Sequence, residues 1–88
     1  MTESELVEIE MRWRNARRGP WKSYVEGRDF TSGYSFIKVG EGDSRSDDIE
    51  LTGATVEDQD FIAAAKQDIP KLIQEIKNLK RKIDELEN

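Results

Sequence analysis

The stretch FIAAAKQDIPKLIQEIKNLKRKIDELEN, residues 61–88, decides the fold because apolar residues recur in it at alternating spacings of three and four. This is the a/d pattern of a heptad repeat and predicts one long helix with an apolar stripe along one side. Pro70 predicts a kink or short break near residues 66–70, or a new helix that begins at Pro70. The stripe consists of Ile62, Ala65, Ile69, Leu72, Ile76, Leu79, Ile83 and Leu86.

Two parts of this stripe are expected to have different partners. We expect Ile62, Ala65 and Ile69, with Phe61 beside them, to pack on the chain's own first helix and sheet. Residues 72–88 extend further than the rest of so short a chain can cover, so we expect a second copy to bury them. The predicted interface consists of Leu72, Ile76, Leu79, Ile83, Leu86, Glu75, Lys80, Lys82 and Glu87.

The residue types in the repeat favour one orientation of that pairing. Isoleucine at every a position, with leucine at most d positions, favours a parallel dimer. In a parallel pair, Glu75 would attract Lys80 of the other copy, and Lys82 would attract Glu87. Antiparallel and four-helix assemblies, including a tetramer, remain alternatives.

The N-terminal block also predicts a helix. Thr2 and Glu5 have the spacing of a capping box, in which each residue satisfies a free backbone N–H of the other. Gly19-Pro20 predicts where this helix ends. The apolar face of this helix consists of Leu6, Ile9, Trp13 and Ala16.

Between the helices, the pattern predicts three strands at residues 21–26, 34–39 and 48–52, joined by loops rich in glycine, serine and aspartate. Short links between consecutive strands favour an antiparallel meander. The expected fold class is therefore α+β: a helix, a three-stranded antiparallel sheet and a long helix kinked near Pro70 that ends in a short coiled coil. We expect one structural domain, with residues 1–71 as its α+β part and residues 72–88 as its coiled-coil extension.

Composition narrows the possible functions. The 88 residues include 14 Lys and Arg against 19 Asp and Glu, for a net charge of −5, and contain no cysteine or histidine. Disulfides, zinc sites built on those ligands, and His or Cys catalysis are excluded. The sequence predicts no catalytic residue, cofactor or metal site, and we expect a non-enzymatic protein.

The acidic N-terminus resembles no secretory signal and no long apolar run is present, so we expect a cytoplasmic protein away from membranes.

Two charged segments suggest other partners. The segment Trp13–Lys22 interleaves basic and aromatic residues, which would suit nucleic acid through Arg14, Arg17, Arg18 and Lys22. The alternative, which we favour, is a solvated helix face beside core tryptophans.

Residues 41–60 hold eight acidic residues and one basic residue, a net charge of −7, and would suit the basic groove of a host factor. The carboxylates at 41–50 miss the EF-hand spacing, so we expect a solvated acidic loop there.

Two segments together carry a resemblance: Gly19-Pro20-Trp21, and the run from Phe61-Ile62-Ala63 to Asp68-Ile69-Pro70-Lys71-Leu72. This combination resembles small uncharacterised bacterial and phage proteins that have a Gly-Pro-Trp strand and an Asp-Ile-Pro helix. It is similar, more loosely, to Ead-type early proteins of temperate phages. The resemblance covers about a third of the chain and implies a phage or prophage origin. It implies no activity and no catalytic residues.

Overall fold

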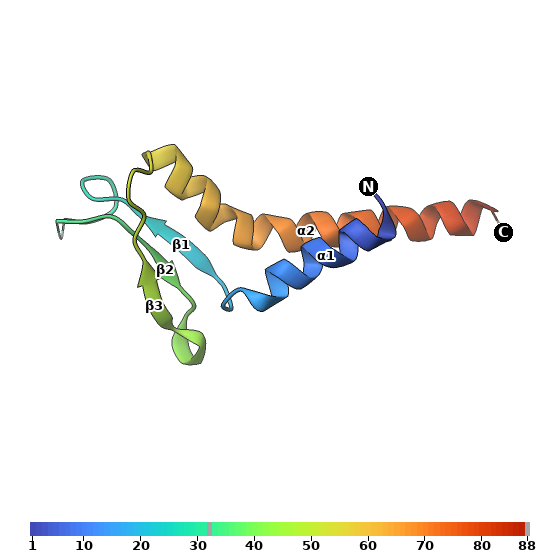
Figure 1. Cartoon of the computed structure of the whole chain (residues 1–88), viewed down its shortest axis with the longest axis horizontal. Coiled ribbons are helices and arrows are strands. Elements are labelled where there is room, and N and C mark those ends of the chain that lie inside the picture. The colour runs from blue at the N-terminus through green and yellow to red at the C-terminus, as the bar shows by residue number, and fades with distance from the viewer. Residues whose placement is uncertain (32, 88) are drawn as a thin grey trace.

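The protein is an elongated body of 59 × 28 × 19 Å in a computed structural model that describes residues 1–31 and 33–87. Figure 1 shows the sheet at one end and the C-terminal turns of the last helix projecting at the other. The predicted α+β order is confirmed, although Asn88 of the last predicted helix lies outside the described residues. The elements are α1 (Glu3–Asn15), β1 (Trp21–Tyr24), β2 (Phe36–Val39), β3 (Ser46–Ile49) and α2 (Val56–Glu87).

Helix α1 begins where the capping box predicts. The backbone N–H of Glu5 donates to Thr2 Oγ1 at 3.0 Å, and the backbone N–H of Thr2 donates to Glu5 Oε1 at 2.9 Å. These hydrogen bonds satisfy two groups that a helix start leaves without partners. The hydrogen bond from the Thr2 backbone lowers the pKa of the Glu5 carboxyl.

The three strands form the predicted antiparallel meander in the order β1-β2-β3. Trp21 pairs with Val39 and Ser23 with Ile37, so these four residues share the face of the sheet that α2 covers. Ile37 and Val39 are fully buried there. On the other face, four aromatic rings contact one another in a second small cluster: Tyr24, Phe30, Tyr34 and Phe36.

All three strands are shorter than the sequence predicts, and β3 is also displaced. Strand β1 ends at Tyr24 because the backbone N–H of Val25 turns to the Asp29 carboxylate, at 2.8 Å. Strand β3 was predicted at residues 48–52, but it begins at Ser46, directly after a short 3₁₀ turn at Gly42–Ser44. The β2–β3 register is irregular between Ile37 and Val39, and this irregularity accommodates the displaced strand.

A glycine makes the turn between β2 and β3 possible. Gly40 has a φ of +78°, and a Cβ atom built on it would lie 2.0 Å from the carbonyl oxygen of Ser44. No other residue fits there without moving the backbone.

Helix α2 continues through Pro70 without the predicted break or second start. Figure 1 nevertheless shows its axis changing direction part-way along the helix, which agrees with the predicted kink. The helix starts with its own reciprocal cap, in which the N–H of Asp58 donates to Thr55 Oγ1 at 3.0 Å. In the described part of the chain, neither helix combines the length and apolar character needed to cross a membrane.

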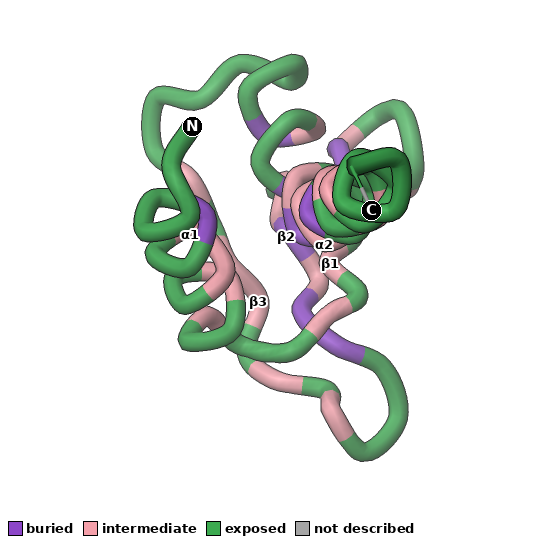
Figure 2. The backbone as a smooth tube through the Cα atoms, turned by 90° about the vertical axis from the view of Figure 1, so that its right-hand side faces the viewer, coloured by how far each residue is buried: buried purple, intermediate pink, exposed green. Residues whose placement is uncertain are grey.

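The buried core is small and lies between α2 and the other elements (Figure 2). The last turns of α2, nearest the viewer in that figure, are exposed on all sides. The buried apolar residues are Leu6, Val25, Ile37, Val39, Ala63 and Ile73.

Candidate interaction surface

Helix α1 runs antiparallel to α2 and covers only its middle. Trp13, near the end of α1, bonds Lys66, while Glu10 pairs with Lys77 at 3.1 Å and Glu3 pairs with Lys80. The contacts on α2 therefore extend from residue 66 to residue 80. Residues 81–87 form an overhang that α1 does not reach.

The contact between Trp13 and Lys66 follows from the proline one turn later. Pro70 has no N–H to donate to the carbonyl of Lys66, so that carbonyl lacks its helical partner. The indole N–H of Trp13 donates to it instead, at 2.8 Å. In return, Lys66 Nζ donates to the carbonyl of Trp13 at 2.9 Å.

Lys66 is the most unusual residue in this contact between α1 and α2 because it is a lysine that is only 7% exposed. Its Nζ lies 4.5 Å from the ring centroid of Trp13 and 5.5 Å from that of Trp21, close enough for cation–π attraction to both. Burial lowers the pKa of the Lys66 ammonium. Its cation also faces the C-terminal carbonyls of α1, where the helix dipole favours positive charge.

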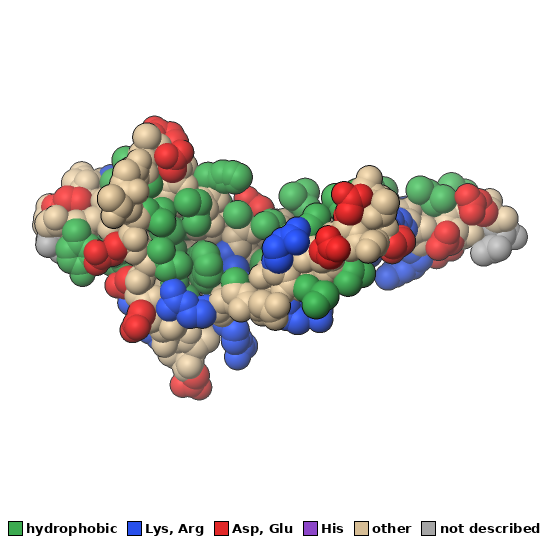
Figure 3. Space-filling model, in the orientation of Figure 1, with side chains coloured by type: hydrophobic (Ala, Val, Ile, Leu, Met, Phe, Trp, Pro, Cys, Tyr) green, Lys and Arg blue, Asp and Glu red, His purple; other side chains and the backbone are tan. Residues whose placement is uncertain are grey.

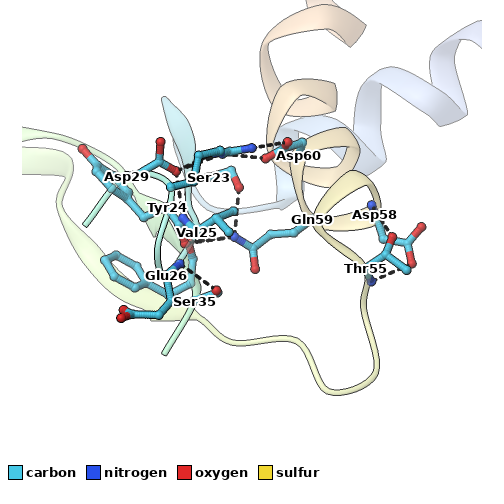
Figure 4. Close-up of polar contacts among 12 residues, drawn as sticks. Ser23, Tyr24, Val25, Glu26, Asp29, Ser35, Thr55, Asp58, Gln59 and Asp60 are labelled. Carbon is cyan, nitrogen blue, oxygen red and sulfur yellow. Dashed lines mark hydrogen bonds and ion pairs between the residues drawn. The ribbon is translucent and has the colours of Figure 1, made fainter. Parts of the chain in front are cut away.

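Two glutamines of α2 bind the backbone of the sheet. Gln67 accepts from the N–H of Trp21 at 2.7 Å and donates to the carbonyl of Trp21 at 3.1 Å. Gln59 is buried, and Figure 4 shows its amide pointing into the sheet. Its Nε2 lies 2.9 Å from Ser23 Oγ and 3.2 Å from the carbonyls of both Tyr24 and Phe36.

These contacts decide which side of α2 faces the rest of the chain. The buried residues Gln59, Ala63, Lys66 and Ile73 follow spacings of four, three and seven, which places them on one face. The predicted apolar stripe lies beside this face. The prediction that Phe61 and Ile62 pack inside the chain is therefore wrong, because both are exposed, whereas Ala65 and Ile69 are half-buried.

The C-terminal part of the stripe is left without cover. Leu72 is 63% exposed, Leu79 48%, Ile83 54% and Leu86 87%, while Ile76 is half-buried. Figure 3 shows hydrophobic side chains recurring along the exposed length of α2, with charged side chains between them.

An open apolar groove of about 300 Å³ joins this stripe to α1. It lies between the two helices and contains no charged lining residue. Its walls are Met1, Leu6 and Ile9 from α1 and the segment before it, and Ile69, Leu72, Ile73 and Ile76 from α2.

The charged residues predicted to flank the interface fall into two groups. Lys80 is engaged within its own chain by Glu3. Glu75, Lys82 and Glu87 are exposed, and within residues 1–31 and 33–87 they form no ion pair.

The basic segment that could suit nucleic acid is partly engaged inside the chain. Arg17 donates to Ser46 Oγ at 2.9 Å and to the carbonyl of Asp47 at 2.8 Å. Arg14 pairs with Glu10, and the Lys22 ammonium lies 5.2 Å from the ring centroid of Tyr24. Arg18 is exposed near the end of α1, beside a shallow pocket. The two tryptophans of this segment are half-buried.

The acidic segment does not gather its carboxylates at one point. Asp48 pairs with Arg45 at 2.7 Å, while Glu41, Asp43 and Asp47 are exposed. In the part of the chain that the structure describes, no group of three acidic side chains is placed to hold a metal ion.

A small charge cluster ties the turn after β1 to α2. Arg28 pairs with Asp29 at 2.9 Å and with Asp60 at 2.7 Å. The hydrogen bonds from Arg28 lower the pKa of both carboxyls below their usual value of 3.8. Their ionised forms are therefore favoured by folding.

This cluster predicts that the free energy of unfolding depends on pH in the acidic range. Its contribution is complete above the usual carboxyl pKa of 3.8 and is lost as the pH falls through the lowered values. Arg28→Met is expected to lose less stability than the wild type between about pH 6 and about pH 3 in urea denaturation. Arg18→Met, outside the cluster, is the control and should follow the wild type. Equal acid sensitivity in Arg28→Met and wild type would contradict the assignment.

Comparison of the chain with protein-family models, with curated proteins and with solved structures gave no match.

Proposed function

We propose that this chain is a non-enzymatic interaction protein that acts as a homo-oligomer, in the simplest case a dimer joined through the stripe from Leu72 to Leu86. The observation that carries the proposal is the exposure of Leu72, Leu79, Ile83 and Leu86 at heptad spacing on one side of α2. Scattered apolar residues are normal on a protein surface, but a contiguous row marks an interaction site.

The energetics favour burial of this row. Full burial of a leucine or isoleucine contributes about 1.5–3 kcal/mol. Four such residues from each copy therefore give a gain comparable with the cost of association, about 4–15 kcal/mol.

The small core gives a second reason for association. Six apolar residues are buried among those that the structure describes, and the chain has no cysteine with which to form a disulfide. Domains of this size commonly rely on disulfides, metals or oligomerisation for stability. Self-association would add the stripe of each copy to the buried apolar surface.

The test compares two double variants by size-exclusion chromatography with light scattering. Leu79→Asp with Ile83→Asp places two charges on the stripe, and we expect it to be a monomer of 10.2 kDa under conditions where the wild type has twice that mass. Gln74→Asp with Asn78→Asp is the matched control, since it adds the same charge at the same spacing away from the stripe and should keep the wild-type mass. Circular dichroism would establish that both variants are folded. Equal masses for the wild type and both variants would contradict the proposal.

We extend the proposal to a phage or prophage origin, on the resemblance of Gly19-Pro20-Trp21 and the run from Phe61 to Leu72 to the small bacterial and phage proteins described above. The genes beside the coding sequence test this part. Phage or prophage genes on both sides would support it, and a conserved housekeeping operon would contradict it.

A further inference from the structure

The overhang and the groove of this chain have matching chemistry and matching length. The overhang presents Ile83 and Leu86, with Leu79 one turn before Ile83, while the groove beside α1 is walled on its α2 side by Ile69, Leu72, Ile73 and Ile76. We infer that two copies pair antiparallel, so that the overhang of each copy fills the groove of the other. This inference rests on the proposed self-association and gives it an orientation.

One antiparallel register brings the two features together. With the two-fold axis between residues 77 and 78, Leu79 of the partner subunit lies at the level of Ile76, Ile83 of the partner subunit at Leu72, and Leu86 of the partner subunit at Ile69. Every large apolar residue of the overhang then faces a residue that lines the groove.

The flanking charges fit the same register. Residues at g positions face one another across an antiparallel pair, so Glu75 would meet Lys82 of the partner subunit, once on each side of the axis. Both residues are exposed and have no ion pair within the described chain, so this contact breaks no existing one. The parallel arrangement would instead use Lys80, which already pairs with Glu3.

The position of α1 also distinguishes the two orientations. Because α1 covers residues 66–80 of α2, an antiparallel partner places its overhang against a surface built by both α1 and α2. In a parallel pair, the overhangs would contact only each other. A parallel pair would join residues 72–86 of the two copies, and the last two turns of each would pack on no part of α1.

The two orientations predict different overall lengths. The C-terminus lies about 14 Å past the axis at about 1.5 Å per residue, so a chain 59 Å long would extend about 45 Å to the other side. The antiparallel dimer should therefore show a maximum dimension of about 90 Å in small-angle X-ray scattering, against about 60 Å for a parallel dimer of the same mass.

Single cysteines introduced into this cysteine-free chain provide the decisive test. We expect Leu72→Cys and Ile83→Cys, mixed in a glutathione redox buffer, to form a disulfide between the two variants, and neither alone to cross-link. In the antiparallel register the two copies of residue 83 lie about 16 Å apart, beyond the reach of a disulfide.

The outcomes separate this inference from the proposal on which it rests. A cross-link in Ile83→Cys alone, with a maximum dimension near 60 Å, would overturn the antiparallel orientation and leave self-association intact. A dimeric mass with no cross-link in any sample would also overturn it. A monomeric mass would overturn both the orientation and the proposed function. A mixed disulfide together with the longer dimension would support both.

Discussion

Replacement of Trp13 by alanine is expected to lower the free energy of unfolding by about 3 kcal/mol, near the lower end of the range for tryptophan truncation because the side chain is half-buried. The substitution removes the ring that the Lys66 ammonium faces at 4.5 Å. It also removes the indole N–H that donates to the Lys66 carbonyl, which Pro70 deprives of its helical partner. Urea denaturation followed by circular dichroism at one fixed protein concentration measures the change.

Trp13→Phe separates the hydrogen bond from the ring. Phenylalanine keeps an aromatic face for Lys66 but has no N–H, so we expect an intermediate loss of about 1–2 kcal/mol. If Trp13→Phe were as stable as the wild type, the hydrogen bond from the indole to the Lys66 carbonyl would have no energetic role. This explanation of the contact between α1 and α2 would then be wrong.

Replacement of Gln59 by leucine is expected to cost about 3 kcal/mol, although the side-chain size is nearly kept. The two N–H groups of the buried Gln59 amide are shared among the Ser23 hydroxyl and two backbone carbonyls of the sheet. Leucine removes all of these hydrogen bonds, and each hydrogen bond of this kind contributes about 0.5–1.5 kcal/mol to stability. The same denaturation measurement applies, with loss of the Gln59 hydrogen bonds as the physical cause.

Gln59→Glu is the matched test for this site. Glutamate has the same shape but cannot donate when ionised, and its charge would be buried beside carbonyl oxygens. We therefore expect it to be at least as destabilising as leucine at neutral pH, and to recover part of the loss in mild acid as the carboxyl gains a proton. A Gln59→Leu variant with wild-type stability would show that the hydrogen bonds of Gln59 do not hold the sheet to α2.

Local features of the sequence predicted the elements and their order. The Thr2 and Glu5 capping box marked the start of α1 because its two hydrogen bonds involve residues only three apart. The apolar spacing of residues 61–88 predicted that they form one long helix, and Pro70 predicted its change of direction. Strand ends were less predictable, because β1 ends through a carboxylate contact with Asp29 that no strand pattern encodes.

The face of α2 that packs inside the chain could not be predicted from apolar periodicity. Apolar periodicity considers only apolar residues, and it therefore assigned Ile62 to the packed face. The packed face instead includes the polar residues Gln59 and Lys66. These long polar side chains are buried because they satisfy backbone groups of the sheet and of α1. One signal was present: a proline four residues after Lys66 frees the carbonyl of Lys66 and calls for a donor from elsewhere.

That difference between the faces strengthens the case for a partner. If the apolar stripe had been the packed face, α1 and the sheet would have buried its first half. Instead, polar residues make the internal contacts, and the stripe lies beside them with Leu72 and Leu79 exposed. Phe61 and Ile62, which the sequence assigned to the interior, are exposed as well.

Sedimentation equilibrium of the wild-type chain over a wide range of concentrations tests self-association most directly. The mass of one chain is 10.2 kDa, and we predict a mass of twice that value which falls toward one chain only on dilution. A mass of 10.2 kDa at every concentration would contradict self-association through the stripe of α2.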